Sequence, residues 1–516
     1  MARVACLLIA FGAIAAGAAQ AATLTVQADG LGDYPTIQAG VDAALPGDTV
    51  LLAPGVYMGG GNVNVSYLGK GITVTSEDSD PATCIIDCQA VVLSPARGFT
   101  FDSGEDESAV LSCVTVREGM QLGGAVYCEG SSPTIERCIF LNNTATDVAS
   151  YYLGGALMCY MAAPLIRDCE FIGNEAIWGG AIGGLSSTVH VLDCGFEGNT
   201  GGLGGALYLD HDQGSKIQGC SIKGGSADLG AGLWIRDATG TIISETMFLG
   251  NAAGLGGGAI RCQFGGDAVV SQCLISSNSA TQYGGGISCF KSSPRIVAST
   301  IVGNFSALGA GLSVAGDSTT VAEMCVIAFN AGGSGLHGIN GASVAMSCSD
   351  VFGNEGGNVG GELSDQTGLY GNISENPLFC DFDDRNFTLA EGSPCLPGGN
   401  DCSVQIGAFG MGCTWTGVEE ASPPYPMLGA NYPNPFNPST TIPFSMDAPA
   451  TIRLIVLDVT GRLVTTLTDG QAYSAGSHAV RWDGLDAAGQ AMPSGMYFYR
   501  LEVPAGATAR PMLLVK

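Results

Sequence analysis

The sequence is poor in basic residues. Its 516 residues include 19 Lys and Arg against 47 Asp and Glu, which gives a formal net charge of −28. A nucleic-acid partner is therefore not expected, because phosphate contacts need clustered Lys and Arg. A strongly polyanionic ligand would also need local basic side chains to overcome the repulsion from this net negative charge. We expect no cofactor and no dedicated metal site, although an acidic surface is compatible with Ca²⁺.

Long hydrophobic runs are absent after the first 21 residues, so no later segment reaches membrane-spanning length. Residues 1–21 combine Arg3 with an apolar run and the small-x-small sequence Ala19-Gln20-Ala21. This arrangement is typical of a secretory signal peptide cleaved after Ala21. The run is too short and too rich in alanine for a membrane anchor. We therefore expect a protein that is secreted or held on the outer cell surface.

Helical patterns are scarce as well. Between residues 113 and 348, no window offers twelve residues of helical periodicity free of glycine. This region instead repeats about every 26 residues. Each unit begins at an anchor position, which is occupied by Cys113, Cys138, Cys169, Cys194, Cys220, Thr246, Cys273, Ser299, Cys325 and Cys348. A fixed period of this length indicates stacked structural units.

Within a unit, Asn usually stands five residues after the anchor, and a turn such as Gly154-Gly155-Ala156 follows. After the turn, apolar side chains alternate with mixed ones, which is the pattern of a β-strand. Short strands joined by tight turns predict one rung of a parallel β-helix, with equivalent residues about 4.8 Å apart. The Asn side chains would then bond to one another in a ladder. The anchor Cys would be small buried hydrophobes, although disulfides between adjacent rungs are compatible with the spacing.

The run from Gly32 to Ala39 (GDYPTIQA), with Gly47-Asp48-Thr49-Val50 after it, resembles the opening segment of right-handed β-helix proteins of the pectin lyase-like superfamily. The Gly-Gly-Ala and Phe-x-x-Asn signatures also resemble repeats of chlamydial polymorphic outer-membrane proteins. The resemblance covers residues 24–412 and implies a right-handed parallel β-helix. It implies a fold rather than an activity.

Both ends of this β-helix, residues 22–413, carry their own signals. Residues 36–45 predict a helix that caps the open end of the core. Residues 376–413 resemble the closing segment of bacterial β-helices and contain Cys380, Cys395, Cys402 and Cys413. Export would permit disulfides, and these four Cys allow three pairings.

A linker at residues 414–427 leads to a segment of different composition, residues 428–516. Its alternating strands predict a small β-sandwich. The run from Tyr432 to Pro438 (YPNPFNP) resembles the C-terminal sorting domain of type IX secretion cargo, and equally the immunoglobulin-like domain of the flagellar hook-capping protein. Sorting would imply export with the help of the outer-membrane secretion machinery; a sandwich spacer is the alternative. The predicted fold class is all-β, a right-handed parallel β-helix followed by a small C-terminal immunoglobulin-like β-sandwich.

The outward positions of the strand after each glycine turn form the candidate ligand-binding face. Aromatic rings beside carboxylates and guanidinium groups suit sugar recognition. The candidate substrate-binding residues are Tyr160, Tyr208, His211, Trp234 and Gln263, and the candidate catalytic residues are Asp210, Arg236, Asp237 and Arg261. In a lyase, Arg would remove a proton, and in a hydrolase, Asp210 and Asp237 would flank the glycosidic oxygen. Alternatively, these side chains are surface cross-strand pairs worth less than about 1 kcal/mol.

No catalytic set known from pectin-degrading enzymes stands out. The sequence lacks the Arg-x-Lys motif, and His190, His337 and His478 show no metal-ligand spacing. The favoured hypothesis is therefore non-catalytic binding of a glycan or another surface. A polysaccharide lyase or glycoside hydrolase is the first alternative, and an adhesin or structural spacer is the second. An extracellular or cell-wall polysaccharide is the expected partner.

Overall fold

The computed structural model describes residues 21–145, 153–266, 268–382, 384–414, 427–429, 431, 436–446, 449–458, 462–474, 476–493, 495–503 and 506–514. The predicted signal peptide, apart from its last residue, lies outside the described residues. So do residues 415–426 of the predicted linker and residues 432–435 of the C-terminal motif. Among the described residues, no helix is long and apolar enough to cross a membrane.

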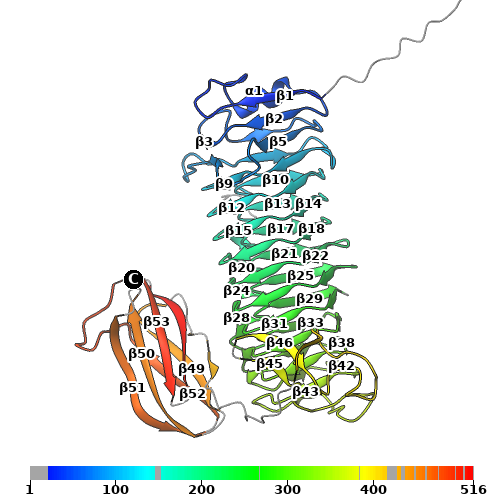
Figure 1. Ribbon diagram of the computed structural model, residues 1–516, viewed down its shortest axis with the longest axis vertical. Helices are drawn as coiled ribbons and strands as arrows, with labels where there is room; N and C mark the ends of the chain where they lie inside the picture. The colour runs from blue at the N-terminus through cyan, green and yellow to red at the C-terminus, as the bar shows by residue number, and fades with distance from the viewer. Residues whose placement is uncertain are drawn as a thin grey trace, which may run out of the picture.

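Most of the described chain winds into a parallel β-solenoid built from four sheets (Figure 1). Sheet 1 has 13 strands, from β1 (Thr23–Val26) to β42 (Ser343–Ser347). Sheet 3 has 12 strands, from β3 (Gly55–Tyr57) to β43 (Asp350–Phe352). The strands of each sheet pair in parallel with those of the neighbouring coils, one coil being about 26 residues long. The predicted parallel β-helix is confirmed.

Sheets 2 and 4 meet at the glycine turn of each coil. Sheet 2 holds the strands after the turn, which are β4 (Val65–Ser66), β7 (Phe99–Phe101), β10 (Val126–Glu129), β13 (Leu157–Tyr160), β17 (Ile182–Leu185), β21 (Leu207–Asp210), β25 (Leu233–Ala238), β29 (Ile260–Gly266), β33 (Ile287–Phe290), β37 (Leu312–Ala315), β41 (Leu336–Ile339) and β44 (Val359–Gly361). Sheet 4, which the sequence did not predict, holds the strands before it, which are β16 (Glu175–Trp178), β20 (Thr200–Leu203), β24 (Ser226–Leu229), β28 (Ala252–Gly256), β32 (Ser279–Ala280), β36 (Phe305–Ser306) and β40 (Ala331–Gly332).

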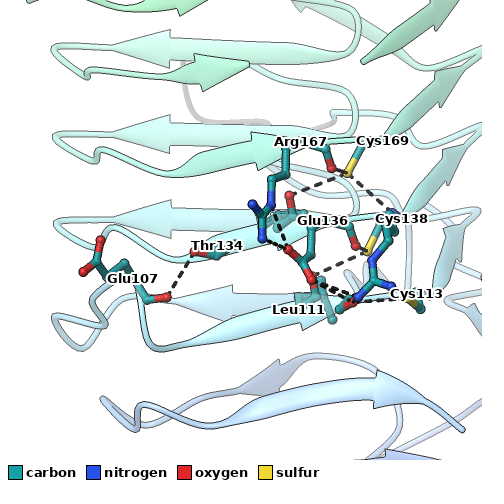
Figure 2. Close-up of polar contacts among 11 residues, drawn as sticks. Glu107, Leu111, Cys113, Thr134, Glu136, Cys138, Arg167 and Cys169 are labelled. Atoms are coloured by element: carbon teal, nitrogen blue, oxygen red, sulfur yellow. Dashed lines mark hydrogen bonds and ion pairs between the residues drawn. The ribbon is translucent and has the colours of Figure 1, made fainter. Parts of the chain in front are cut away.

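The anchor side chains lie in the core at one corner of each coil, where they link neighbouring coils. Cys169 Sγ accepts a hydrogen bond from the backbone N–H of Cys138 at 3.5 Å (Figure 2) and donates to the carbonyl oxygen of Arg167 at 3.2 Å. The hydroxyls of Thr246 and Ser299 accept the equivalent bond in their coils. In the coils where the anchor side chain makes these bonds, it must be small and must both donate and accept, which explains why Cys, Thr and Ser replace one another there.

Two of the predicted anchors, Cys113 and Cys348, are wrong by one residue. The strand register places Val114 and Ser349 at the anchor in those coils. Ser349 Oγ accepts a hydrogen bond from the N–H of Cys325 at 3.0 Å. Cys113 and Cys348 stand one position earlier, at a corner where φ is 54° and 47°. The Cys348 thiol is therefore not part of the ladder and can bond elsewhere.

The predicted Asn ladder is confirmed. Asn251 Nδ2 donates to Asn278 Oδ1 at 2.9 Å, and Asn278 Nδ2 donates to Asn304 Oδ1 at 3.0 Å. The same amide of Asn278 also donates to a backbone carbonyl of an earlier coil at 2.9 Å. The ladder is interrupted at Gly225, because a Cβ atom there would lie 2.6 Å from a backbone oxygen.

The first coil is covered by the predicted helix, α1 (Ile37–Ala43) (Figure 1). Thr36 is its N-cap and accepts a hydrogen bond from the backbone N–H of Ala39 at 3.2 Å. Ile37 and Val41 are completely buried in the solenoid core. The helix therefore supplies apolar side chains that cover the core at the first described coil.

After the last coil, the closing segment folds back along the outside of the solenoid (Figure 1). It forms a three-stranded sheet of β45 (Phe379–Asp381), β46 (Asn386–Ala390) and β47 (Met411–Cys413). Phe387 packs against Leu274 and Val302 on the outer face of sheet 3. This segment therefore shields an apolar patch of that face.

Two disulfides secure the closing segment, Cys348–Cys402 and Cys380–Cys413. Cys395 is a buried free thiol. The expectation that the four Cys of this segment pair among themselves is therefore wrong, because the misassigned anchor Cys348 takes one of them. The other described Cys residues, including the in-register neighbours Cys128 and Cys159, are buried free thiols.

The C-terminal domain consists of two antiparallel sheets, as predicted. One contains β48 (Met427–Leu428), β49 (Thr440–Met446) and β52 (Gly476–Trp482). The other contains β51 (Leu463–Tyr473), β50 (Ala450–Asp458), β53 (Gly495–Val503) and β54 (Gly506–Leu514), the last of which was not predicted. Side chains of both sheets share one apolar core, which includes Ile442, Trp482, Leu454 and Tyr499.

Candidate functional site

The outward side chains of sheet 2 form a second apolar cluster, separate from the solenoid core. Its buried members are Leu153, Met158, Tyr208 and Trp234. Partly buried side chains pack around them, and these are Leu122, Tyr127, Tyr160, Trp178, Leu185, Leu203 and Leu229. The glycine turns create this cluster, because they bring the last residue of each sheet 4 strand beside the strand of sheet 2 that follows. The expectation of an open sheet face is therefore wrong at these coils.

Three aromatic rings from successive coils stack at the centre of the cluster. The ring centroids of Trp178 and Tyr208 lie 5.6 Å apart, and those of Tyr208 and Trp234 lie 4.7 Å apart, with interplanar angles of 10° and 7°. Gly183, the register partner of Tyr208, leaves no room for a side chain, since a Cβ there would lie 2.7 Å from the nitrogen of Gly154. Trp178 supplies the ring in that layer instead. Both faces of Tyr208 are consequently covered, so a sugar can reach only ring edges there.

Beside these rings is a hollow of about 320 Å³. Its walls combine the three aromatic rings with four Leu side chains and with polar groups at one end, and it is lined by Leu153, Trp178, Leu185, Leu203, Tyr208, Asp210, Leu229, Trp234, Arg236, Gln263 and Phe264. We call this hollow the aromatic cleft. A mainly apolar depression with a few convergent polar groups is the usual form of a small-ligand site.

The polar end of the aromatic cleft is organised around Asp210, whose side chain is 9% exposed. Tyr208 Oη donates a hydrogen bond to Asp210 Oδ2 at 3.0 Å. Burial, together with this carboxylate, raises the pKa of the Tyr208 phenol above its usual range, so the hydroxyl remains a donor. His211 Nδ1 lies 2.9 Å from Asp210 Oδ1, and Arg236 Nε lies 3.9 Å from the same oxygen. Arg236 Nε also lies 3.4 Å from Asp237 Oδ2, so Asp237 belongs to the same group of charged side chains.

Four buried polar atoms of the aromatic cleft have no hydrogen-bond partner in the described chain, namely Asp210 Oδ1, Arg236 Nε, Trp234 Nε1 and Gln263 Oε1. The first two belong to the ionic group around Asp210, so Trp234 Nε1 and Gln263 Oε1 are left without either a hydrogen bond or an ion pair. One is a donor and the other is an acceptor. Buried polar atoms in folded proteins nearly always have partners, and the exceptions require an explanation. A bound ligand that carries both donors and acceptors would satisfy these two atoms.

The remaining candidates lie next to the aromatic cleft rather than in its wall. Arg261 is 8% exposed and in register with Trp234. Its Nη1 donates to the hydroxyl of Ser288, and its guanidinium lies 5.7 Å from the ring centroid of Phe290. Burial lowers the pKa of this guanidinium. Tyr160 packs at the edge of the apolar cluster.

Sequence reasoning thus singled out Tyr208, Asp210, Trp234, Arg236 and Gln263, which the structure brings together in one cleft. It missed the residues that directly precede the glycine turns, which are Leu153, Trp178, Leu203 and Leu229. A signal for them was present, because a bulky apolar residue directly precedes the glycine turn in each of these coils.

Family models match two parts of the chain. Residues 205–374 match the model of the right-handed beta helix region, and residues 436–506 match that of the FlgD Ig-like domain. The solenoid is therefore a right-handed β-helix, and the C-terminal domain is of the FlgD immunoglobulin-like type.

Solved structures resemble the chain only distantly. The periplasmic alginate epimerase AlgG is 12% identical, with 64% of this chain and 77% of AlgG covered at a TM-score of 0.41. Pectate lyase Pel9A is 13% identical, with 76% and 96% covered and a TM-score of 0.35. Dimeric latent PorU from Porphyromonas gingivalis is 25% identical over 19% of this chain and 10% of PorU, with a TM-score of 0.17. No curated protein matches the sequence. Activity has to be argued from the site itself.

Proposed function

We propose that the aromatic cleft binds a glycan and that the protein acts as a non-catalytic recognition module. The observation that supports this most directly is the pair of unpartnered buried atoms, Trp234 Nε1 and Gln263 Oε1. Sugar hydroxyls both donate and accept hydrogen bonds, so neighbouring hydroxyls of one ring can satisfy both atoms. The edges of the stacked rings and the four Leu side chains provide apolar contact for the C–H groups of the sugar.

The geometry does not favour an inverting hydrolase that uses Asp210 and Asp237, because such an enzyme needs its two carboxyl groups about 6.5–9.5 Å apart to admit a water molecule. A retaining hydrolase needs them about 5–5.5 Å apart and needs one carboxylate free to attack the sugar. Ligand atoms of Asp210, His211 and Asp237 all lie within 4.8 Å of one another. Arg236 also approaches both carboxylates. The pair therefore forms one ionic cluster rather than the two sides of a reaction site.

A polysaccharide lyase is the second candidate, and one observation favours it. His211 is 58% exposed, and its Nδ1 lies 2.9 Å from the buried Asp210 carboxylate. An exposed His close to a carboxylate is a common general base. The adjacent Arg236 guanidinium could neutralise the carboxylate of a uronic acid. Formation of unsaturated products, lost in His211→Ala, would replace the binding proposal with this one.

Binding is tested with the mature chain, residues 22–516, on a glycan array and then by titration of the glycans retained. Trp234→Phe keeps an aromatic ring in the stack but removes Nε1, and Gln263→Leu removes the acceptor. We expect each to weaken binding about tenfold, the usual worth of one hydrogen bond in a binding site. Gln218→Leu, which removes an exposed amide of sheet 1, is the matched control and should bind normally. Unchanged affinity in both cleft variants would reject the aromatic cleft as the site.

We further propose that the protein is exported and displayed on the outer surface or released. Support comes from the N-terminal sequence, from the two disulfides, and from the resemblance of the C-terminal domain to sorting domains. In a host that has the secretion machinery, deletion of residues 428–516 should trap the chain inside the outer membrane. Normal export of the deletion variant would instead favour the spacer hypothesis for this domain.

A further inference from the structure

Three side chains of metal-ligand type converge beside the polar end of the aromatic cleft. Asp210 ends β21, His211 follows it, and Asp237 occupies the corner equivalent to His211 in the next coil. One ligand atom from each residue lies within 4.8 Å of the other two. The backbone imposes this arrangement, since φ is 53° at His211 and 45° at Asp237 and the two corners stack. The cluster is therefore built by the coil geometry.

An independent observation points to a ligand here. Asp210 Oδ1 is buried and takes part in no hydrogen bond, and the whole side chain is only 9% exposed. The Tyr208 hydroxyl holds the other oxygen, Oδ2, which fixes the orientation of the carboxylate. His211 Nδ1 lies 2.9 Å from Oδ1 without hydrogen-bond geometry. A buried carboxylate oxygen is unfavourable until a donor or a cation completes it.

We propose that Asp210, His211 and Asp237 bind one divalent transition-metal ion, such as Mn²⁺ or Zn²⁺. A set of one imidazole nitrogen and two carboxylates suits these ions, whereas Ca²⁺ takes six to eight oxygen ligands. The 2.9 Å between Asp210 Oδ1 and His211 Nδ1 matches neighbouring ligands at right angles around an ion, each about 2.1 Å from it. Water can complete the coordination sphere, because the His211 and Asp237 side chains are 58% and 38% exposed.

Arg236 is the competing cation at this site. Its Nε lies 3.4 Å from Asp237 Oδ2 and 3.9 Å from Asp210 Oδ1, and that nitrogen makes no hydrogen bond. The side chain is 42% exposed, so its ion pairs are weak and it can swing into solvent. Metal binding displaces this guanidinium. Removing it should therefore strengthen metal binding, about tenfold for one positive charge some 5 Å from a divalent ion in a solvated site.

The test uses the mature chain after dialysis against EDTA, with Mn²⁺ as the probe and electron paramagnetic resonance as the readout of bound ion. Mn²⁺ is chosen because it prefers oxygen and nitrogen ligands to the many thiols of this chain. We expect one Mn²⁺ per chain. His211→Ala and Asp237→Asn should each weaken binding at least tenfold, and Arg236→Gln should tighten it about tenfold. His190→Ala, on sheet 1, and Asp228→Asn, on sheet 4, are matched controls that should bind as the parent does.

The optical spectrum of bound Co²⁺ identifies the ligand atoms, since thiolate ligands give intense charge-transfer bands that imidazole and carboxylate do not. The proposal is overturned if no Mn²⁺ binds, if His211→Ala and Asp237→Asn bind it as the parent does, or if the Co²⁺ spectrum shows thiolate ligation. All of these measurements are made without glycan. A failure of the glycan proposal therefore does not affect the metal test, and a failure of the metal proposal does not affect the glycan test.

Discussion

Single side chains hold neighbouring coils together where each of them bonds to two coils at once. Cys169 shows this for the anchor position, since its thiol accepts from the backbone of one coil and donates to that of its own. The sequence identified these Cys as buried and small, which is correct. It did not reveal their hydrogen bonds, because a thiol in a sequence looks the same whether it only packs or also bonds.

Substitution of Cys169 separates packing from hydrogen bonding. Cys169→Ser retains a donor and an acceptor, as Ser299 and Ser349 do naturally, and should leave the denaturation midpoint almost unchanged. Cys169→Ala leaves the N–H of Cys138 without a partner and should destabilise the protein by about 1–3 kcal/mol. Chemical denaturation followed by circular dichroism measures both variants. An equal loss of stability in the two variants would show that the thiol stabilises the protein only by filling space.

Asp350 makes the stability of the closing region depend on pH. Burial raises the pKa of its carboxyl from 3.8 to about 7. Cys395 Sγ donates to its Oδ2 at 3.4 Å, and the N–H of Glu375 donates to Oδ1 at 3.1 Å. Because the folded pKa lies above the unfolded one, the folded state holds the extra proton between these values. Stability therefore falls as the pH rises from about 4 to 7, by up to about 4 kcal/mol.

We accordingly predict that Asp350→Asn raises the thermal midpoint clearly more at pH 8 than at pH 5, and leaves it nearly unchanged only below about pH 4. The amide cannot ionise, so the variant avoids the loss of stability that accumulates in the parent as the pH rises from about 4 to 7. Asp401→Asn, an exposed residue of the closing segment, should have no effect at either pH. A gain for Asp350→Asn of equal size at both pH values would contradict this account.

At the scale of strands and sheets, the repeat period determined most of the fold. The helix at the first coil and the strands after the glycine turns followed from periodicity and turn residues. The strand register could not be predicted in this way. Cys113 and Cys348 lie one residue before the true anchors, and only the pairing of whole strands reveals this shift. Sheet 4 was missed because strands of two to five residues carry too little alternation to be recognised. The aromatic cleft was missed with it, since Trp178 reaches Tyr208 from that sheet.

Loss of a bond in the Asn ladder should destabilise several neighbouring coils. In Asn278→Ala, the neighbours above and below both lose a hydrogen bond at a completely buried position. We expect a loss of about 2–4 kcal/mol, which a lower denaturation midpoint would show. Asn142→Gly, which keeps the left-handed backbone (φ 53°) of an exposed residue at the adjacent position, is the matched control and should change stability by less than about 0.5 kcal/mol. Equal effects of both would mean that the ladder adds no stability.

At the scale of the whole molecule, the two ends of the solenoid are closed in different ways. The first coil is covered by α1, which is held by packing and by hydrogen bonds, such as those between Gln38 and Ser66 and from Lys70 to the last turn, but by no disulfide among the described residues. At the other end, the closing segment is tied down by Cys348–Cys402 and Cys380–Cys413 and covers an apolar patch of sheet 3. We therefore expect a reducing agent to loosen the closing segment and to leave α1 in place.

Limited proteolysis tests this difference. With Cys348→Ser and Cys402→Ser combined, we expect faster cleavage within residues 376–414 while the preceding coils resist the protease, because local opening no longer has to stretch a closed loop. Asp401→Asn, which changes an exposed residue of the same segment, is the control and should be cleaved at the parent rate. Uniform cleavage along the chain would show that the disulfide stabilises the entire solenoid instead.

The register of the coils also bears on how such a protein diversifies. No coil contributes more than three side chains to the aromatic cleft, whereas the anchor and Asn of a coil fit any neighbour that carries the same pair. Unequal exchange between gene segments that encode single coils would preserve both ladders and replace one wall of the cleft. Ligand preference in a lineage built this way can change in steps of one duplicated or deleted coil, without passing through unfolded intermediates.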